Sequence, residues 1–260
     1  MRSTRSRGWV LVALIVAPTL AGCAATRRGP IAGGVGPDQL LATLAARRAS
    51  LTSLRARARL KAGLAGLWTR QAVLVQRPGE VRMDVLSPFG LALAVGTQGD
   101  LLWAYSPSDQ VRYEGEASPK NLARFLGAPV TVTDLVDILM GLPPARTPTA
   151  PPAFTRDPDQ RIVITVTFEG GTQRLWFDPV TLQLDRGEEW HGDTLVFTLA
   201  FSDYRDGFPY ALDVASPVAG SSARLAYDSV EQNPALEASL FAPPSSSRVL
   251  PIEAAATTSG

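Results

Sequence analysis

Val81-Arg-Met-Asp-Val-Leu-Ser-Pro-Phe-Gly-Leu-Ala-Leu-Ala-Val95 is the stretch from which the fold can be deduced. Its first half alternates apolar and charged residues, which is the period-two pattern of a strand with one buried face. Pro88 and Gly90 then interrupt the pattern, because proline fixes its own φ and glycine allows positive φ. An apolar extended run follows. The stretch therefore predicts a β-hairpin with Phe89 at its tip.

The aromatic side chain at this tip has two interpretations. A turn tip faces water and normally carries polar residues, so Phe89, between Pro88 and Gly90, is a candidate contact for a membrane or an apolar ligand. Alternatively, Phe89 folds back onto its own sheet, since single exposed apolar side chains are common on protein surfaces. The sequence leaves both open.

Further segments of the same kind extend through most of the chain, separated by turn signals about every ten residues. The expected strands cover residues 54–61, 68–77, 81–86, 91–97, 101–105 and 111–114, and then 162–168, 173–177, 182–188, 194–204, 210–215 and 223–230. Amphipathic or capped segments at residues 37–50, 118–127 and 131–141 predict three helices, and residues 144–159 read as a loop.

An antiparallel sheet of this size tends to curl and needs an apolar cover on one face. The three helices are the available cover. The sequence therefore predicts a mainly β (α+β) fold: a curved, unclosed antiparallel half-barrel of about 11–12 strands with a helical lid. Such a fold would enclose a space lined by apolar side chains.

The N-terminus has the pattern of an export signal. Arg2, Arg5 and Arg7 precede a short apolar run, which is too short for a transmembrane helix. The run ends in Leu20-Ala-Gly-Cys23, which resembles the lipobox of bacterial lipoproteins. That resemblance implies acylation of Cys23, and Ala24 in the next position favours the outer membrane. The alternative is an ordinary signal peptide with a chance cysteine.

The expected organisation has four parts. Residues 1–22 form the lipoprotein signal peptide, and residues 23–36, which are small and Gly-rich, form a flexible tether. Residues 37–242 form the half-barrel domain. Residues 243–260 are rich in Pro, Ser and Ala, which predicts a disordered tail.

Composition excludes some function classes and leaves others without support. Without the first 22 residues the chain has 22 basic and 24 acidic residues, a net charge of −2, which does not suggest nucleic acid. The single Cys excludes an internal disulfide framework. The lone His191 makes a metal site or a His-based triad unconvincing. The carboxylate pairs Glu188–Glu189 and Asp134–Asp137 are expected to be solvated. We therefore expect no enzyme, cofactor or metal.

The segment at 54–61 shows the cleanest alternation in the chain. Leu54, Ala56, Ala58 and Leu60 alternate with a basic series, Arg55, Arg57, Arg59 and Lys61. This basic series is either a solvated face or a contact for lipid headgroups or a partner protein.

Two stretches resemble the LolA/LolB family of periplasmic lipoprotein carriers and receptors, and the outer-membrane lipoprotein LolB most closely. They are residues 81–95, with the strand–Ser-Pro-Phe-Gly–strand pattern, and residues 126–144, Leu-Gly-Ala-Pro-Val-Thr-Val-Thr-Asp-Leu-Val-Asp-Ile-Leu-Met-Gly-Leu-Pro-Pro. The element order matches over roughly residues 37–230. The family's lid-helix Trp is replaced here near Ile138, and residues 231–260 extend beyond the LolB pattern.

The resemblance implies a function. The chain is expected to be a monomeric outer-membrane lipoprotein that faces the periplasm, binds acyl chains of lipidated cargo and helps to insert lipoproteins into the outer membrane, with a LolA-like periplasmic carrier as a further partner. Pro88, Phe89 and Gly90 would form the membrane and cargo-transfer loop.

The expected lining of the cavity comes from the lid and the sheet. Its candidates are Leu135, Ile138, Leu139, Trp103, Trp176, Phe197 and Phe201. Each of these residues could equally be ordinary core packing. The alternative function is a protein-binding or sensor lipoprotein of the cell envelope on the same fold, without lipid cargo.

Overall fold

A computed structural model of the chain describes residues 36–62, 67–126, 129–246 and 248–255. The strands of the first half are β1 (Ser53–Ala62), β2 (Trp68–Gln76), β3 (Glu80–Ser87), β4 (Gly90–Gln98), β5 (Leu101–Ser106) and β6 (Val111–Glu116). The later strands are β7 (Ala153–Arg156), β8 (Ile162–Phe168), β9 (Gly171–Phe177), β10 (Leu184–His191), β11 (Thr194–Arg205), β12 (Phe208–Ser216), β13 (Ser221–Gln232) and β14 (Arg248–Pro251). The helices are α1 (Pro37–Ser50), α2 (Pro119–Leu126), α3 (Val132–Leu139) and the short 3₁₀ turns η1 (Ala238–Phe241) and η2 (Ile252–Ala254).

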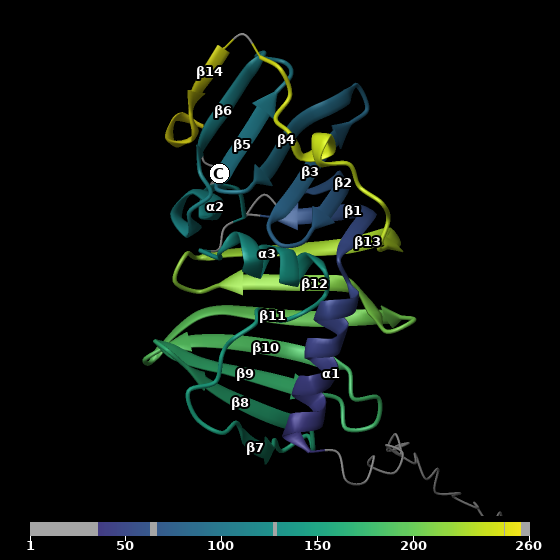
Figure 1. Ribbon diagram of the computed structural model, residues 1–260, viewed down its shortest axis with the longest axis vertical. Coiled ribbons are helices and arrows are strands. Elements are labelled where there is room, and N and C mark those ends of the chain that lie inside the picture. The colour runs from purple at the N-terminus through teal and green to yellow at the C-terminus, as the bar shows by residue number, and fades with distance from the viewer. Residues whose placement is uncertain (1–35, 63–66, 127–128, 247, 256–260) are drawn as a thin grey trace, which may run out of the picture.

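Within the described ranges, all 14 strands belong to one open sheet (Figure 1). The predicted fold class, an unclosed and mainly antiparallel half-barrel with a helical lid, is confirmed. The number of strands exceeds the expected 11–12, because β7 lies in the expected loop and β14 in the expected disordered tail. In place of disorder, β14 pairs in parallel with β6 at the sheet edge.

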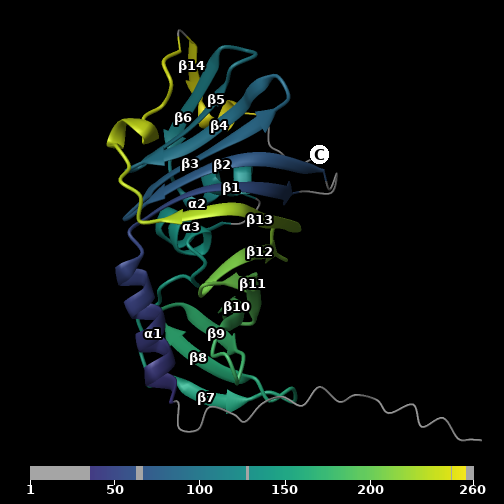
Figure 2. The same ribbon diagram turned by 90° about the vertical axis from the view of Figure 1, so that its right-hand side faces the viewer.

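The first and last long strands meet in the middle of the sheet. β1 pairs with β2 on one side and with β13 on the other. The chain runs outward from β1 to β6, crosses by α2 and α3, and returns from β7 at the far edge to β13. The sheet is curved, and α3 lies on its hollow side (Figure 2).

The hollow face carries the core. Alternate residues along each strand point to this face, as the pleat requires, and pack with side chains from the helices. Leu54, Val73, Leu102, Ile164 and Leu212 are among its buried members. On the helical side, Leu40 of α1 and Leu51, which follows α1, belong to the same cluster.

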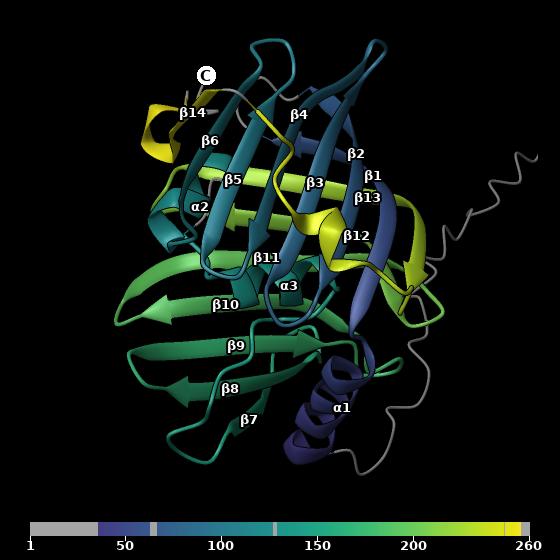
Figure 3. The ribbon, with the colours of Figure 1, turned by 45° about the horizontal axis from the view of Figure 1, so that its top comes forward.

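The opposite, outer face is partly covered by the C-terminal segment. This segment crosses β3, β4 and β5 before it reaches β14 (Figure 3). Trp103 of β5 lies beneath it, fully buried, and its indole N–H donates to the carbonyl of Phe241 at 3.0 Å. Gly96 on the neighbouring strand faces the Trp103 ring, and a Cβ there would collide with it.

One end of the strands, here called the rim, gathers exposed apolar side chains. The pairing register places the turns after β3 and β12 and the start of β2 at this end. The exposed apolar residues there are Leu67, Trp68, Leu86, Phe89 and Val218. The rim is therefore more apolar than is usual for turns that face water.

Candidate functional site

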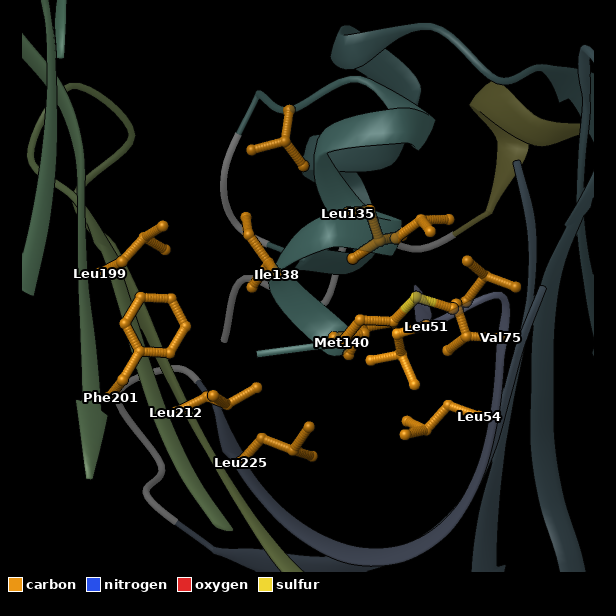
Figure 4. Packing of buried hydrophobic residues seen from close by; sticks show 14 of the residues in the cluster. Leu51, Leu54, Val75, Leu135, Ile138, Met140, Leu199, Phe201, Leu212 and Leu225 are labelled. Carbon is orange, nitrogen blue, oxygen red and sulfur yellow. The ribbon is translucent and has the colours of Figure 1, made fainter. Parts of the chain in front are cut away.

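Helix α3 forms the centre of the site. Thr131 caps its N-terminus, because the Thr131 hydroxyl accepts the backbone N–H of Asp134 at 3.1 Å. The helix ends before Gly141, whose φ of +68° suits glycine. Spacing of three and four residues places Leu135, Ile138 and Leu139 on one stripe, which faces the hollow side of the sheet. Figure 4 shows Leu135 and Ile138 on this stripe.

A crevice lies between this stripe and the sheet. Its volume is about 70 Å³. Each described residue of its lining has an apolar side chain: Leu135, Ile138 and Leu139 from α3 with Leu60, Ala62, Met83, Leu212, Val214, Ala223 and Leu225 from the sheet. The structure thus places Leu135, Ile138 and Leu139, the three lid candidates from the sequence, together on one wall of this crevice.

The crevice is small in this state. An engineered apolar cavity of about 150 Å³ holds a benzene molecule, so 70 Å³ is too little for an acyl chain. A larger ligand would need α3, or the side chains beneath it, to move. Ala62 and Ala223 lie at the rim ends of their strands, so the crevice is close to the rim.

The back of α3 is held by a buried carboxylate. Asp137 is fully buried, and its oxygens accept from Arg77 at 2.7 Å and from Arg48 at 3.1 Å. The backbone N–H of Ala145 donates to the same carboxylate at 3.1 Å. Arg48 also donates to the carbonyl of Pro143 at 2.6 Å. These contacts tie the lid to α1 and to the end of β2, away from the rim.

A second buried ion cluster connects the lid to the other half of the sheet. The Arg146 guanidinium binds both oxygens of Asp134, at 2.8 and 3.0 Å, and both oxygens of Glu189, at 2.8 and 3.1 Å. Burial raises the pKa of Glu189, and its ion pair with Arg146 offsets only part of that rise. His191 lies 3.3 Å from Glu189.

Both carboxylate pairs expected to be solvated are instead buried, so this prediction was wrong. The loop that follows α3 covers both Asp134 and Asp137: its Arg146 binds Asp134, and the Ala145 N–H donates to Asp137. Helical spacing alone cannot locate these partners. Glu188 and Glu189 point to opposite faces, as expected for consecutive strand residues. On each face, however, other side chains pack over the carboxylate and bury it. Glu188 accepts from the Trp190 indole at 3.0 Å on the outer face, and Glu189 meets Arg146 on the hollow face.

The lid also receives a hydrogen bond from the centre of the sheet. The hydroxyl of Tyr227 on β13 donates to the carbonyl of Leu139 at 2.6 Å. Complete burial raises the pKa of this hydroxyl, so it stays protonated and remains a donor. Because helix-end carbonyls have no intrahelical partner, this bond satisfies one of them.

The hairpin tip at the rim is fully exposed. Phe89 has a relative accessibility of 100% and does not fold back onto the sheet. Ser87 holds the turn, because its hydroxyl accepts the Phe89 N–H at 3.2 Å and donates to the Gly90 carbonyl at 3.0 Å. Pro88 precedes Phe89, and Gly90 has a φ of +111°. Of the two positions that the sequence allowed for Phe89, exposed at the tip or folded back onto the sheet, the structure has the exposed one.

The four sheet-side candidates divide by face. Phe197 and Phe201 belong to the hollow-face core, although neither lines the crevice itself. Figure 4 shows Phe201 on the sheet side, across from α3. Trp103 and Trp176 point to the outer face, so their assignment to the cavity was wrong. Their neighbours Leu102 and Leu175 occupy the core instead, because consecutive strand residues face opposite sides.

Some of the expected features lie outside the described residues, namely the signal peptide (residues 1–22), the acylated Cys23 and residues 24–35 of the tether. Across the described ranges, no group of three or more His, Cys, Asp or Glu side chains is arranged to hold a metal ion. In the same ranges, no helix combines the length and the apolar character needed to cross a bilayer.

The architecture defines a class of protein: an open β half-barrel whose hollow face holds an apolar crevice under a tethered lid helix. No family model matches the sequence, and no curated protein matches it. Solved structures do match in shape. A LolA superfamily protein from Nitrosomonas europaea has a TM-score of 0.54 at 16% identity, over 81% of this chain and 99% of that protein.

Two other structures match to a similar degree. One is an outer membrane lipoprotein-sorting protein domain from Vibrio parahaemolyticus, and the other is a DUF1329 family protein from Desulfovibrio piger. Each has a TM-score of 0.51 at 15% identity, over 78% of this chain and 94% of its own. At such low identity the match establishes the fold alone, which is LolA-like.

Proposed function

We propose that this protein is a lipid-anchored envelope protein that binds acyl chains of lipoproteins beneath α3 and helps to insert them into the outer membrane. The observation that carries the proposal is the crevice, whose ten lining residues are all apolar although buried ion clusters lie behind the same helix. Such a crevice suits a hydrocarbon chain. The proposal involves binding and release without catalysis.

The energetics favour a lid helix, α3, that moves when an acyl chain binds. Burial of an acyl chain gains about 0.8 kcal/mol per CH₂, so even a short chain can offset the cost of moving side chains. The polar anchors of Asp137 lie away from the rim, whereas the crevice lies toward it. The rim side of α3 can therefore move while Arg48 and Arg77 keep the other side in place.

The rim supplies a route to the membrane in this proposal. Phe89 is the most exposed large apolar residue described, and Trp68 and Leu86 lie on the strands next to its turn. An aromatic tip partitions into the interface of a bilayer. An acyl group on Cys23 would keep the protein on the periplasmic face of the outer membrane. A LolA-like periplasmic carrier would deliver the cargo to the monomer.

Native mass spectrometry tests acyl binding. The unlipidated chain (Cys23→Ala) is incubated with a triacylated lipoprotein or with phospholipid. We expect a bound acylated species, lost in Leu139→Arg because a charge then occupies the crevice. Thr133→Arg is the matched control, since it adds the same side chain on the exposed side of the same helix. Equal binding by both variants contradicts the proposal.

A second function is favoured by the small volume of the crevice. At 70 Å³ the core is nearly filled, as expected for a protein-binding or sensor lipoprotein that carries no lipid. In that case no acylated species is retained by the wild-type chain under any condition. Affinity capture with Arg57→Glu as the negative control would then look for a partner of the basic series on β1.

A further inference from the structure

The outer face of the sheet has a hollow of its own. A trough of about 370 Å³ lies over β11, β12, β13 and the end of β1. Its lining comprises Thr198, Ala200, Asp213, Val214, Ala215, Ser222, Ala223, Arg224 and Lys61. Small side chains form its floor, and Leu199, Leu212 and Leu225, on alternate positions of the same strands, point to the core on the other face.

Four strands contribute to the trough in one row, and the row continues into β2. The register pairs Ala200 with Asp213, Asp213 with Arg224, Arg224 with Lys61, and Lys61 with Trp68. Lys61 and Arg224 are thus directly opposite each other. Like charges in this position are destabilising unless something negative lies between them.

Among the described residues of the trough, one carboxylate is present to relieve this repulsion. Asp213 lies 3.7 Å from Arg224, with both side chains about half exposed, which is a weak pair. Lys61 has no ion-pair partner within the described residues. The trough therefore retains one uncompensated positive charge.

The surroundings of the trough are also basic. On β1 and β2, Arg55 and Arg59 are paired with Glu231 and Asp228, at 2.9 and 3.1 Å. Arg57 and Arg70 have no carboxylate partner in the part of the chain that the structure describes. The positive potential thus extends from the trough along β1, although the whole mature chain is slightly acidic.

We propose that the trough binds the phosphate of an anionic lipid headgroup. Lys61 and Arg224 supply the charge, and the hydroxyls of Thr198 and Ser222 line the same space as hydrogen-bond donors. The phosphate oxygens would sit between the two cations and remove their repulsion. Asp213 opposes binding, because its carboxylate faces the same space.

The position of the trough argues for a lipid as the source of the phosphate. Arg224 is three residues from the start of β13, which is ~10 Å along the strand from the rim. Trp68, opposite Lys61, is itself one of the exposed apolar residues of the rim. When the rim residues enter the edge of the hydrocarbon, the trough lies at the depth of the headgroups.

Vesicle flotation with the unlipidated chain (Cys23→Ala) tests this site. The probes are vesicles of phosphatidylcholine alone and of phosphatidylcholine mixed with phosphatidylglycerol. We expect binding to the mixed vesicles to weaken roughly 30-fold in Lys61→Glu, because each basic charge near an anionic surface contributes about fivefold. Asp213→Asn should bind more tightly than wild type, since it removes the opposing charge.

Lys120→Glu is the matched control. Lys120 is exposed at the start of α2, and its reversal changes the net charge of the protein by the same amount. Equal weakening by Lys61→Glu and Lys120→Glu would show attraction by net charge alone and would overturn the proposal. Unchanged binding in Asp213→Asn, together with unchanged binding in Lys61→Glu, would do the same.

Soluble phosphates distinguish the source. Inorganic phosphate and glycerol 1-phosphate are titrated into the same variants by isothermal calorimetry. Tight binding of these small anions that is lost in Lys61→Glu, without any preference for mixed vesicles, would assign the site to a soluble phosphate and overturn the lipid assignment. Weak or absent heat with them, beside strong flotation, supports the headgroup.

This inference goes beyond acyl binding and does not depend on it. Val214 and Ala223 border both the trough and the crevice. The charged residues of the trough and the lid residues of the crevice nevertheless lie on opposite faces of the sheet, so Lys61→Glu should leave acyl uptake in native mass spectrometry unchanged. Conversely, Leu139→Arg should leave vesicle flotation unchanged. Failure of one site is therefore distinguishable from failure of the other.

Discussion

Arg77, directly after β2, donates to the fully buried carboxylate of Asp137 on α3 at 2.7 Å, and so joins the lid to the sheet through a charge that water does not reach. Arg48 from α1 binds the same carboxylate. Three elements that are far apart in the sequence therefore share one anion. Removal of that anion leaves the two guanidinium groups with backbone carbonyls as partners, those of Pro143 and Leu51, and with no negative charge beside them among the described residues.

Asp137→Ala should destabilise the protein by about 3–5 kcal/mol, the usual cost of removing one partner of a buried ion pair. Urea denaturation followed by circular dichroism measures the change. Asp228→Ala is the control, because its pair with Arg59 is about half exposed and should contribute about 1 kcal/mol or less. Similar losses in the two variants would show that the lid anchor is no stronger than a surface pair.

Phe89→Glu should reduce delivery to membranes without affecting folding or cargo binding. Full burial of a Phe side chain is worth about 1.5–3 kcal/mol, which corresponds to roughly 10- to 100-fold in transfer. Transfer of a fluorescent lipoprotein from the loaded protein to liposomes measures the effect. Val180→Glu serves as the comparison, since Val180 is exposed in the turn before β10, at the opposite end of the strands. Unchanged transfer by Phe89→Glu would show that the hairpin tip has no role in delivery to membranes.

Glu189 should make stability depend on pH in a specific direction. Its folded-state pKa is raised, so its contribution is present at low pH, below the unfolded value, and is lost as pH rises through the raised pKa. The difference in unfolding free energy between wild type and Glu189→Gln should therefore shift against wild type as pH increases above the ordinary glutamate range. Denaturant titrations between acid and neutral pH measure this difference.

Asp178 provides a control of opposite sign. Its carboxylate accepts backbone N–H bonds from Val180 and Thr181, and its pKa is lowered despite the opposing effect of partial burial. The contribution of Asp178 is therefore lost as pH falls. The difference in unfolding free energy between wild type and Asp178→Asn should therefore shift in favour of wild type as pH increases. If this difference and that for Glu189→Gln changed with pH in the same direction, the assignment for Glu189 would be contradicted.

Gly96→Ala should destabilise the first half of the sheet by about 1–3 kcal/mol, the typical cost of an overpacked core. The added Cβ would collide with the Trp103 ring, which is fixed by its bond to Phe241 and cannot move aside. Thermal denaturation measures the loss. Gly187→Ala should be neutral or slightly stabilising, because its Cβ would meet Leu175 at an ordinary 3.5 Å.

Local patterns were sufficient for most of the fold. The twelve expected strands and three helices all form, because alternation, caps and turn residues act over a few neighbouring positions. Helix α1 begins and ends at the expected residues, Pro37 and Ser50. β7 and β14 were missed, since both are four-residue edge strands whose pairing depends on β8 and β6.

The site was only partly predictable for the same physical reason. Leu135, Ile138 and Leu139 were identified from helical spacing, which is local. In a strand whose residues are nearly all apolar, alternation does not show which face packs into the core. Trp103 and Trp176 were therefore placed on the wrong side. Partners such as Arg146 and Asp134 are brought together only by the crossing of the chain between the two halves of the sheet.

The pairing of β1 with β13 has a consequence for how the chain folds. Every other antiparallel pair in the sheet joins consecutive strands, whereas Leu54 and Gln232 are 178 residues apart. Contacts of such high sequence separation carry the largest loop-closure cost and slow folding. We expect the two meanders to form first as separate units. The edge of β1 would then stay open until β13, which lies late in the chain, closes the middle of the sheet.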